Sequence, residues 1–190
     1  KAVLDALGWD DAAIFGMSFG GMVAQEFAVT FPDTVSRLAL LCTSSGGAGG
    51  SSYPLHTLAS LTATERQRIA IYNLDTRFTP EWLAEHPSDQ ALVDVMTNSA
   101  TIEKSDDVQR GEAAQLAARA GHDTWDRLGL IACPTLVAAG RFDALAPLAN
   151  SEALAGAIPN AELDVFEGGH LFIVQDRRAL PRVMEFLLGE

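Results

Sequence analysis

The sequence predicts an α/β protein whose parallel sheet is interrupted once by a helical insertion. Two observations support this class. Short apolar runs of strand length alternate with segments of helical periodicity near both ends of the chain, and the middle of the chain has helical periodicity without a convincing strand. We therefore divide the 190 residues into a first core part (1–45), a helical cap insertion (46–128) and a second core part (129–190).

The first core part is expected to fold in the order helix, strand, helix, strand. A helix over 2–7 ends at Gly8, and the apolar run 12–15 has the length of a short strand. A helix over 20–31 follows. The nearly continuous apolar run 37–42 (RLALLC) is typical of a strand that is buried on both faces. This βαβ order predicts parallel strands.

The insertion begins with a cluster of four glycines between positions 46 and 50, which we interpret as a flexible hinge. No Lys-Ser or Lys-Thr pair follows the cluster, so a phosphate-binding loop is improbable there. The helices expected in the insertion cover 58–74, 80–85, 88–100 and 107–120. The second core part is expected to hold strands over 134–139 and 162–166 and helices over 148–157 and 179–188.

Composition and charge exclude several classes of protein. The chain is 48% apolar and 20% charged, which is ordinary for a globular fold, and no apolar run approaches the roughly 18 residues of a membrane helix. A net charge of −12 disfavours nucleic acid and anionic lipid as partners. Cys42 and Cys133 lie in apolar strand-like runs, where we interpret them as small buried side chains. With no evident secretory leader, we expect a reducing, cytoplasmic location.

The strongest motif is the segment 16–20 (GMSFG), where an apolar strand runs into a helix. This context is the one that a nucleophile elbow requires, with Ser18 on a sharp turn and its hydroxyl clear of the sheet. Side chains at Gly16 and Gly20 are expected to collide across the turn, and Gly21 is expected to let the helix approach the sheet. A chance occurrence is the alternative for so short a pattern in a glycine-rich chain.

The backbone N–H of Phe19 is the expected donor to a developing oxyanion. It opens the helix behind Ser18, where free N–H groups and the helix dipole favour negative charge.

Two further groups follow predicted strands. The segment 140–143 (GRFD), which ends in Asp143, comes directly after the strand 134–139, and the segment 168–170 (GGH), which ends in His170, follows the strand 162–166. The carboxyl ends of parallel strands meet at one edge of a sheet, so both side chains are expected beside Ser18. Singly, Asp143 has the alternative of capping a helix and His170 that of an ordinary loop histidine. The order Ser, Asp, His favours catalysis instead.

The stretches GMSFGGMVAQEFA, CPTLVAAGRFDALAP and FEGGHLFIVQD make the chain resemble the α/β-hydrolase-fold serine hydrolases over essentially all 190 residues. Within that family it is most similar to the branch of 3-oxoadipate enol-lactonases and cofactor-free haloperoxidase-like esterases. The resemblance implies that Ser18 attacks a carbonyl carbon, that His170 carries its proton, and that Asp143 orients His170. It implies no cofactor and no metal, and the chain's four histidines are too scattered for a zinc motif.

About the first third of a usual family member precedes the part that this chain resembles. That segment would supply the second oxyanion N–H, so we expect its absence to lower kcat by about 10²–10³-fold. The strand 12–15 is then expected to present an open edge, which favours association into a homo-oligomer.

The insertion is expected to cover the site and to set specificity. The candidates for an apolar substrate pocket are Met17, Thr43, Trp82, Met96, Trp125 and Leu171, with Tyr53 and Phe78 as further aromatic candidates. Three arginines, Arg110, Arg119 and Arg127, are candidates to pair with a substrate carboxylate. The alternative for each aromatic residue is the core of the insertion, and for each arginine a surface ion pair.

Three functions remain open from the sequence. The leading hypothesis is a cofactor-free serine hydrolase whose partner is a small-molecule ester or lactone. A perhydrolase or haloperoxidase-like activity would use the same triad with peroxide as acyl acceptor. In a different class, a chain lacking the second oxyanion donor would serve as a binding or dimerisation module.

Overall fold

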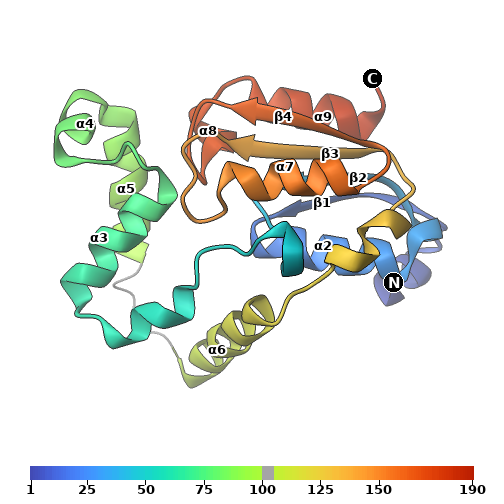
Figure 1. Cartoon of the computed structure of the whole chain (residues 1–190), viewed down its shortest axis with the longest axis horizontal. Helices are drawn as coiled ribbons and strands as arrows, with labels where there is room; N and C mark the ends of the chain where they lie inside the picture. Colours follow the sequence, from blue (N-terminus) through green and yellow to red (C-terminus); the bar gives the residue numbers. More distant parts are fainter. Residues whose placement is uncertain (100–104) are drawn as a thin grey trace.

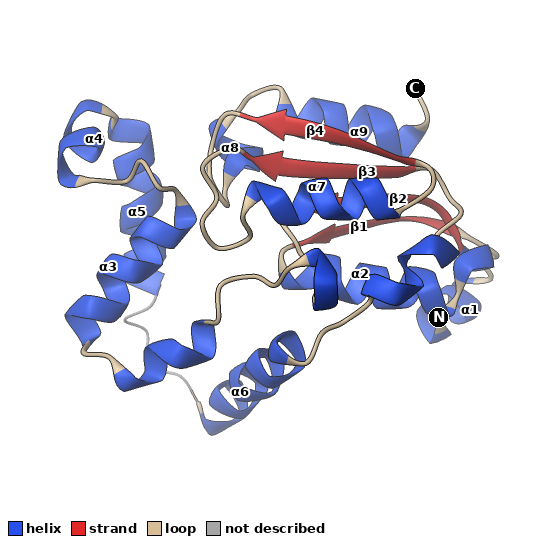
Figure 2. Cartoon of the chain, in the orientation of Figure 1, coloured by secondary structure: helices blue, strands red, loops and turns tan. Residues whose placement is uncertain are grey.

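The protein is described by a computed structural model, which covers residues 1–99 and 105–190. Its sheet has four parallel strands in the order β1-β2-β3-β4 (Figures 1 and 2). The strands are β1 (Ala12–Met17), β2 (Val35–Leu41), β3 (Thr135–Gly140) and β4 (Ala161–Phe166). The sheet therefore joins the two core parts directly, because β2 pairs with β3 across the whole insertion.

The core lies on both faces of this sheet, since successive side chains of a strand point to opposite faces. On one face, Leu38 and Leu40 of β2 pack with α2 (Phe19–Thr30) and α7 (Leu148–Ala157). On the other face, the neighbouring side chains Ala39 and Leu41 join a second cluster under α9 (Ala179–Leu188). A short helix, α8 (Phe172–Gln175), contributes Phe172 to that second cluster. Each fully buried leucine stabilises the fold by about 1.5–3 kcal/mol.

β1 forms one edge of the sheet, because within the described residues it pairs only with β2. Phe15 near its end is 49% exposed. A short helix, α1 (Ala2–Leu7), precedes β1 and ends at Gly8, whose φ of 68° is the left-handed conformation of a helix stop. The structure thus has the open edge that the sequence predicts.

The described part of the insertion consists of helices joined by loops, and Figure 1 shows α3, α4 and α5 beyond the carboxyl ends of the strands. The α-helices are α3 (Ala63–Leu74), α4 (Pro80–Glu85), α5 (Pro87–Ser99) and α6 (Asp106–Ala120). Short 3-10 turns lie at Pro32–Thr34, Gly47–Gly49, Leu55–Ser60 and Trp125–Leu130. The helix expected over 88–100 was predicted to end at Ala100, which lies outside the described residues.

Two expectations for the insertion are wrong. The segment 58–74 is not one helix, because Thr62 and Glu65 form a reciprocal capping box that starts α3 anew after the 3-10 turn. The glycine cluster is not an open hinge either. A Cβ at Gly46 would lie 1.9 Å from the carbonyl oxygen of His122, and one at Gly49 would lie 2.2 Å from the Trp125 ring, so the cluster is a closely packed turn.

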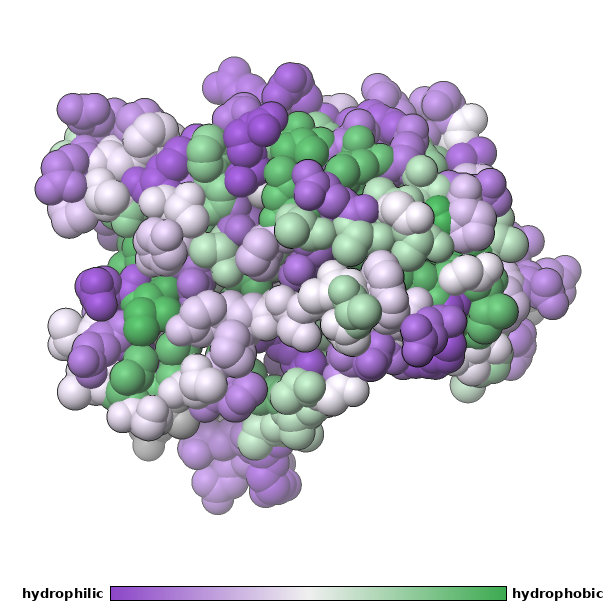
Figure 3. Space-filling view, in the orientation of Figure 1, coloured by the Kyte–Doolittle hydropathy of each residue, from purple (hydrophilic) through white to green (hydrophobic). Residues whose placement is uncertain are grey.

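The surface of the insertion is mixed, and Figure 3 shows apolar patches among hydrophilic ones over its helices. Tyr72 on α3 and Val95 and Met96 on α5 are among the large exposed apolar side chains. No helix in the described part of the chain is long and apolar enough to cross a membrane.

Candidate active site

Ser18 occupies a strained turn between β1 and α2. Its φ of 53° and ψ of −120° lie in a region that non-glycine residues rarely adopt, a strain worth about 1–3 kcal/mol. The turn is tight because a Cβ at Gly16 would lie 2.5 Å from the carbonyl oxygen of Gly20 and 2.8 Å from the Cβ of Ala24. Only glycine fits at position 16.

The same steric reasoning fails at Gly20 and holds at Gly21. A Cβ at Gly20 would meet nothing within 4 Å, so the expected collision at that position is wrong. At Gly21 a Cβ would lie 2.6 Å from the Cβ of Thr43, just beyond β2. Gly21 therefore does allow α2 to approach the end of the sheet.

Thr43 anchors the turn. Its hydroxyl donates to the carbonyl oxygen of Ser18 at 2.8 Å, and the residue is only 1% exposed. The backbone N–H of Ser18 in turn donates to the carbonyl oxygen of Leu41 at 2.8 Å. Ser18 is thus fixed on both sides of its Cα by the end of β2. Thr43, a candidate for the pocket wall, is buried beneath the turn.

Asp143 and His170 meet Ser18 at the carboxyl edge of the sheet. The Ser18 hydroxyl lies 2.9 Å from His170 Nε2, and His170 Nδ1 lies 2.8 Å from Asp143 Oδ2. Asp143 and His170 are each only 6% exposed. The other Asp143 oxygen accepts the backbone N–H groups of Leu145 and Ala146, both at 2.8 Å. One carboxylate therefore caps its own loop and holds the histidine, so the two interpretations of Asp143 are compatible.

Phe19 is the first residue of α2, so its N–H has no acceptor within the helix. It stands next to Ser18, where a carbonyl oxygen under attack would carry negative charge.

The insertion holds the histidine loop in place, which sequence reasoning missed. The carbonyl oxygen of Leu74, the last residue of α3, accepts the backbone N–H of His170. The Gln175 side chain accepts the N–H of Gly169 at 2.9 Å and donates to the buried Asp75 carboxylate at 3.0 Å. No sequence pattern indicated this network, because its partners are about 100 residues apart.

The acid loop is held from the same segment. The N–H of Thr76 donates to the carbonyl oxygen of Phe142 at 2.9 Å. Arg77 pairs with Asp75 through two nitrogens and lies over the rings of Trp82 and Phe142, at 4.8 and 4.1 Å from their centroids. The carbonyl oxygen of Asn73 also accepts the N–H of Leu145 at 3.0 Å. Residues 73–76 therefore contact both the loop that carries Asp143 and the loop that carries His170.

The residues predicted to form an apolar pocket lie in several different environments. Met17 packs into the cluster under α9, and Leu171 precedes α8 at intermediate burial. Trp125 packs against the opposite core cluster. Trp82 stacks on His86 with ring centroids 3.7 Å apart, and Met96 on α5 is 45% exposed.

One group of potential metal ligands occurs among the described residues. Atoms of Cys42, Asp143 and His170 lie within 4.8 Å of one another. Burial raises the pKa of the Cys42 thiol. Asp143 and His170 share a hydrogen bond, so both already have a place in the Ser–His–Asp chain.

These features define a class: a parallel α/β protein with a serine elbow and a buried Ser–His–Asp chain at the carboxyl edge of its sheet. The comparisons agree with that class. The family model described as the alpha/beta hydrolase fold matches residues 1–176. The chain belongs to the α/β-hydrolase family.

Several relatives extend this result. The chain is 34% identical to a poly(3-hydroxyalkanoate) depolymerase of Ectopseudomonas oleovorans and 31% identical to a 2-hydroxymuconate semialdehyde hydrolase of Pseudomonas putida. Each match covers 99% of this chain and 65% or 66% of the relative, so the chain spans about two thirds of their length. The enol-lactonase of Burkholderia xenovorans LB400 superposes with a TM-score of 0.75 at 19% identity, over 99% of this chain and 69% of that one, which shows the shared fold.

Proposed function

We propose that the protein is a cofactor-free serine hydrolase that cleaves a small carboxylic ester or lactone through an acyl-enzyme. The observation that carries the proposal is the continuous hydrogen-bonded chain from Ser18 through His170 to Asp143. A serine hydroxyl is a weak nucleophile unless an adjacent base accepts its proton, and this geometry provides that base.

The proposed reaction has two halves. Ser18 Oγ attacks the carbonyl carbon while its proton moves to His170 Nε2, and the oxyanion that forms accepts the N–H of Phe19. The tetrahedral intermediate expels the alcohol, which takes the proton from His170. Water then attacks the acyl-enzyme with His170 again as base, releasing the acid and free Ser18. Asp143 stabilises the charged imidazole and fixes its orientation throughout.

The names of the relatives support hydrolysis as the reaction class. They include a polyester depolymerase, a semialdehyde hydrolase and an enol-lactonase. A small-molecule substrate fits this range, and the acidic charge of the chain disfavours nucleic acid. Two free cysteines, one of them buried, support a reducing, cytoplasmic setting as part of the same proposal.

Hydrolysis of p-nitrophenyl butyrate and γ-butyrolactone tests the proposal, with the exposed-serine variant Ser88→Ala as control. We expect Ser18→Ala to lower the rate by at least about 10³-fold and Ser88→Ala to leave it unchanged. Adding hydrogen peroxide in the same assay separates a perhydrolase, which would form peracid. A folded chain whose hydrolysis does not depend on Ser18 would contradict the proposal.

A further inference from the structure

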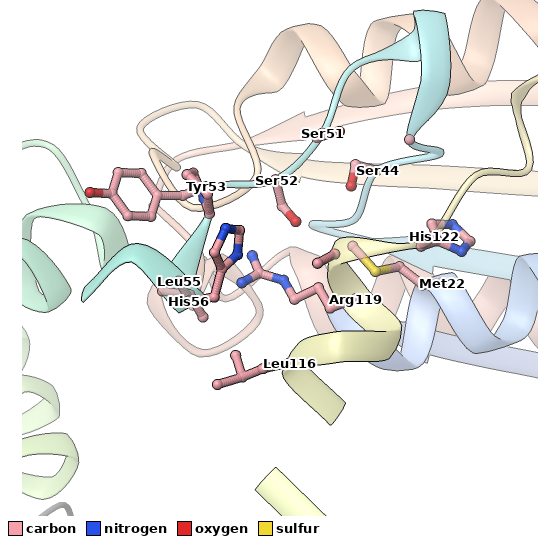
Figure 4. A pocket seen from close by; sticks show the side chains of 13 residues that line it. Met22, Ser44, Ser51, Ser52, Tyr53, Leu55, His56, Leu116, Arg119 and His122 are labelled. Atoms are coloured by element: carbon pink, nitrogen blue, oxygen red, sulfur yellow. The ribbon is translucent and has the colours of Figure 1, made fainter. Parts of the chain in front are cut away.

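A cavity of about 220 Å³ lies between the start of the insertion and the end of α6 (Figure 4). Figure 4 shows Arg119 from α6 pointing into the same hollow as His56 and Ser52 from the opposite wall. Ser44, Met22 and His122 also contribute to the lining.

The cavity is lined by near neighbours of the proposed nucleophile in the chain, although Ser18, Asp143 and His170 do not themselves line it. Met22 follows Ser18 by one turn of α2, about 6 Å along the helix, and its N–H donates to the carbonyl oxygen of Ser18 at 3.3 Å. Ser44 directly follows Thr43, which anchors Ser18. Burial lowers the pKa of Arg119 and the Asp143 carboxylate partly offsets this, so Arg119 is within electrostatic reach of the triad.

Among the three arginines considered as carboxylate partners, only Arg119 is available. Arg110 pairs with Asp107 on the exposed surface of α6. Arg127 makes a bidentate ion pair with Glu26. The Arg119 side chain forms no hydrogen bond or ion pair with any residue that the structure describes. A guanidinium carries five N–H donors, so a half-buried one without an acceptor is costly unless a ligand supplies it.

Two further polar atoms of the residues that line the cavity also lack partners. The hydroxyl of Ser44 and Nε2 of His122 are buried polar atoms without a hydrogen-bond partner within the described part of the chain. The residues that line the cavity include no Asp or Glu, although the chain as a whole carries a net charge of −12. A cation without an acceptor, in a cavity whose lining carries no acidic side chain, indicates a polar, anionic ligand.

We propose that this cavity is a carboxylate-binding subsite and that Arg119 is a specificity residue for the reaction at Ser18. This subsite rests on the proposed function and narrows the substrate class. The substrate is an ester or lactone that carries a free carboxylate a few bonds from the scissile carbonyl. The planar guanidinium matches a carboxylate through two parallel hydrogen bonds, and the hydroxyl of Ser52 and the ring of His56 surround it. Met22 and Leu116 provide apolar wall for the connecting carbon chain.

Binding tests the subsite without requiring turnover. Calorimetric titration of the Ser18→Ala chain compares methyl hydrogen glutarate, which has a free carboxylate, with neutral dimethyl glutarate. We expect the acid to bind at least about ten-fold more tightly, the advantage of a charge-assisted hydrogen-bond pair. Arg119→Met is expected to remove the difference, Arg119→Lys to restore part of it, and Arg110→Met to keep it.

Kinetics on the chain with Ser18 intact supply the second readout. Methanol release from the two esters gives kcat/KM, and Arg119→Met is expected to lower it about 10–100-fold for the acid while leaving the neutral diester unchanged. Equal affinities of the Ser18→Ala chain for both esters would overturn the subsite, as would a preference that survives Arg119→Met in a folded variant.

The two proposals fail in distinguishable ways. A carboxylate preference that depends on Arg119, together with turnover that does not depend on Ser18, would retain the subsite and overturn the hydrolase mechanism. Ser18-dependent turnover with no carboxylate preference would retain the hydrolase and overturn the subsite.

Discussion

The backbone N–H of His170 donates to the carbonyl oxygen of Leu74, so the last residue of α3 in the insertion directly holds the histidine of the triad. A Cβ at Gly169 would lie 1.9 Å from that same carbonyl oxygen, which shows how closely the two segments meet. The insertion therefore supports the loop that carries His170. Changes in residues 73–76 should affect chemistry at Ser18.

Gln175 gives one test of this support. Gln175→Leu removes the acceptor of the Gly169 N–H and the donor to Asp75. Because both bonds fix the loop that carries His170, we expect hydrolysis of p-nitrophenyl butyrate to fall about ten-fold and its pH profile to shift. Gln90→Leu removes a side-chain bond to Asp94 on the surface of α5 and should change neither. Equal rates in the parent and both variants would show that the network does not position His170.

Two glycines of the elbow form a matched pair. Gly16→Ala would force a Cβ to within 2.5 Å of the Gly20 carbonyl oxygen, and we expect the free energy of unfolding to fall by about 1–3 kcal/mol. Gly20 lies in α2, and a Cβ at this position would contact nothing within 4 Å. Gly20→Ala should therefore leave the free energy of unfolding unchanged or raise it by up to about 1 kcal/mol. Urea denaturation measures both. The reverse order of stability would contradict the described geometry of the elbow.

Thr43 tests the anchoring of the nucleophile. Thr43→Val keeps the shape of the side chain but leaves the Ser18 carbonyl oxygen without its donor, which we expect to cost about 1–3 kcal/mol in unfolding free energy. Thr43→Ser keeps the hydroxyl and should cost less. Urea denaturation and the rate of butyrate ester hydrolysis are measured for all three chains. We expect both stability and rate to fall in the order parent, Thr43→Ser, Thr43→Val. A valine variant as active and stable as the parent would rule out an anchoring role.

Asp176 predicts a pH dependence of stability. Hydrogen bonds from Arg178 and from the backbone hold the pKa of the Asp176 carboxyl well below its usual range. A depressed carboxyl pKa stabilises the fold fully above the unfolded-state value, about 3.9, and this contribution is lost as the pH falls through the lower folded-state value.

We therefore expect Asp176→Asn to lower Tm at pH 6, with the difference from the parent shrinking below about pH 4. Asp126→Asn, at an exposed position, should show no such trend. A Tm difference for Asp176→Asn that stays constant from pH 6 to pH 2 would exclude the assigned role of its charge.

The sequence anticipates what depends on local pattern. Pro80 is the first residue of α4 and follows the N-cap residue Thr79. The Thr79 hydroxyl accepts the backbone N–H of Trp82, as expected of a helix cap. The apolar runs on either side of the insertion become neighbouring strands because parallel strands bury both faces. Ser18, Asp143 and His170 are predictable because Ser18 directly follows β1, and Asp143 and His170 lie on the loops that directly follow β3 and β4. Topology alone brings such loops to one edge of the sheet.

One error in the prediction is local: Thr62 and Glu65 have the Thr-x-x-Glu spacing of a capping box, which the prediction of one helix over 58–74 overlooked. The other features that the sequence does not show depend on contacts between distant segments. The links from Leu74 and Asp75 to the histidine loop depend on how the insertion packs against the core. The three arginines look alike in the sequence, and only the structure shows that Arg110 pairs with Asp107 and Arg127 with Glu26. Arg119 forms no ion pair with any of the described residues.

Labelling with a fluorophosphonate probe tests the central claim most directly, because the probe reacts only with an activated serine. Intact-mass spectrometry is applied to the parent chain and to Ser18→Ala, with folding of each checked by circular dichroism. We predict a single adduct on the parent and none on Ser18→Ala. A folded parent that remains unlabelled, or an adduct that persists in Ser18→Ala, would contradict the assignment of Ser18 as the nucleophile.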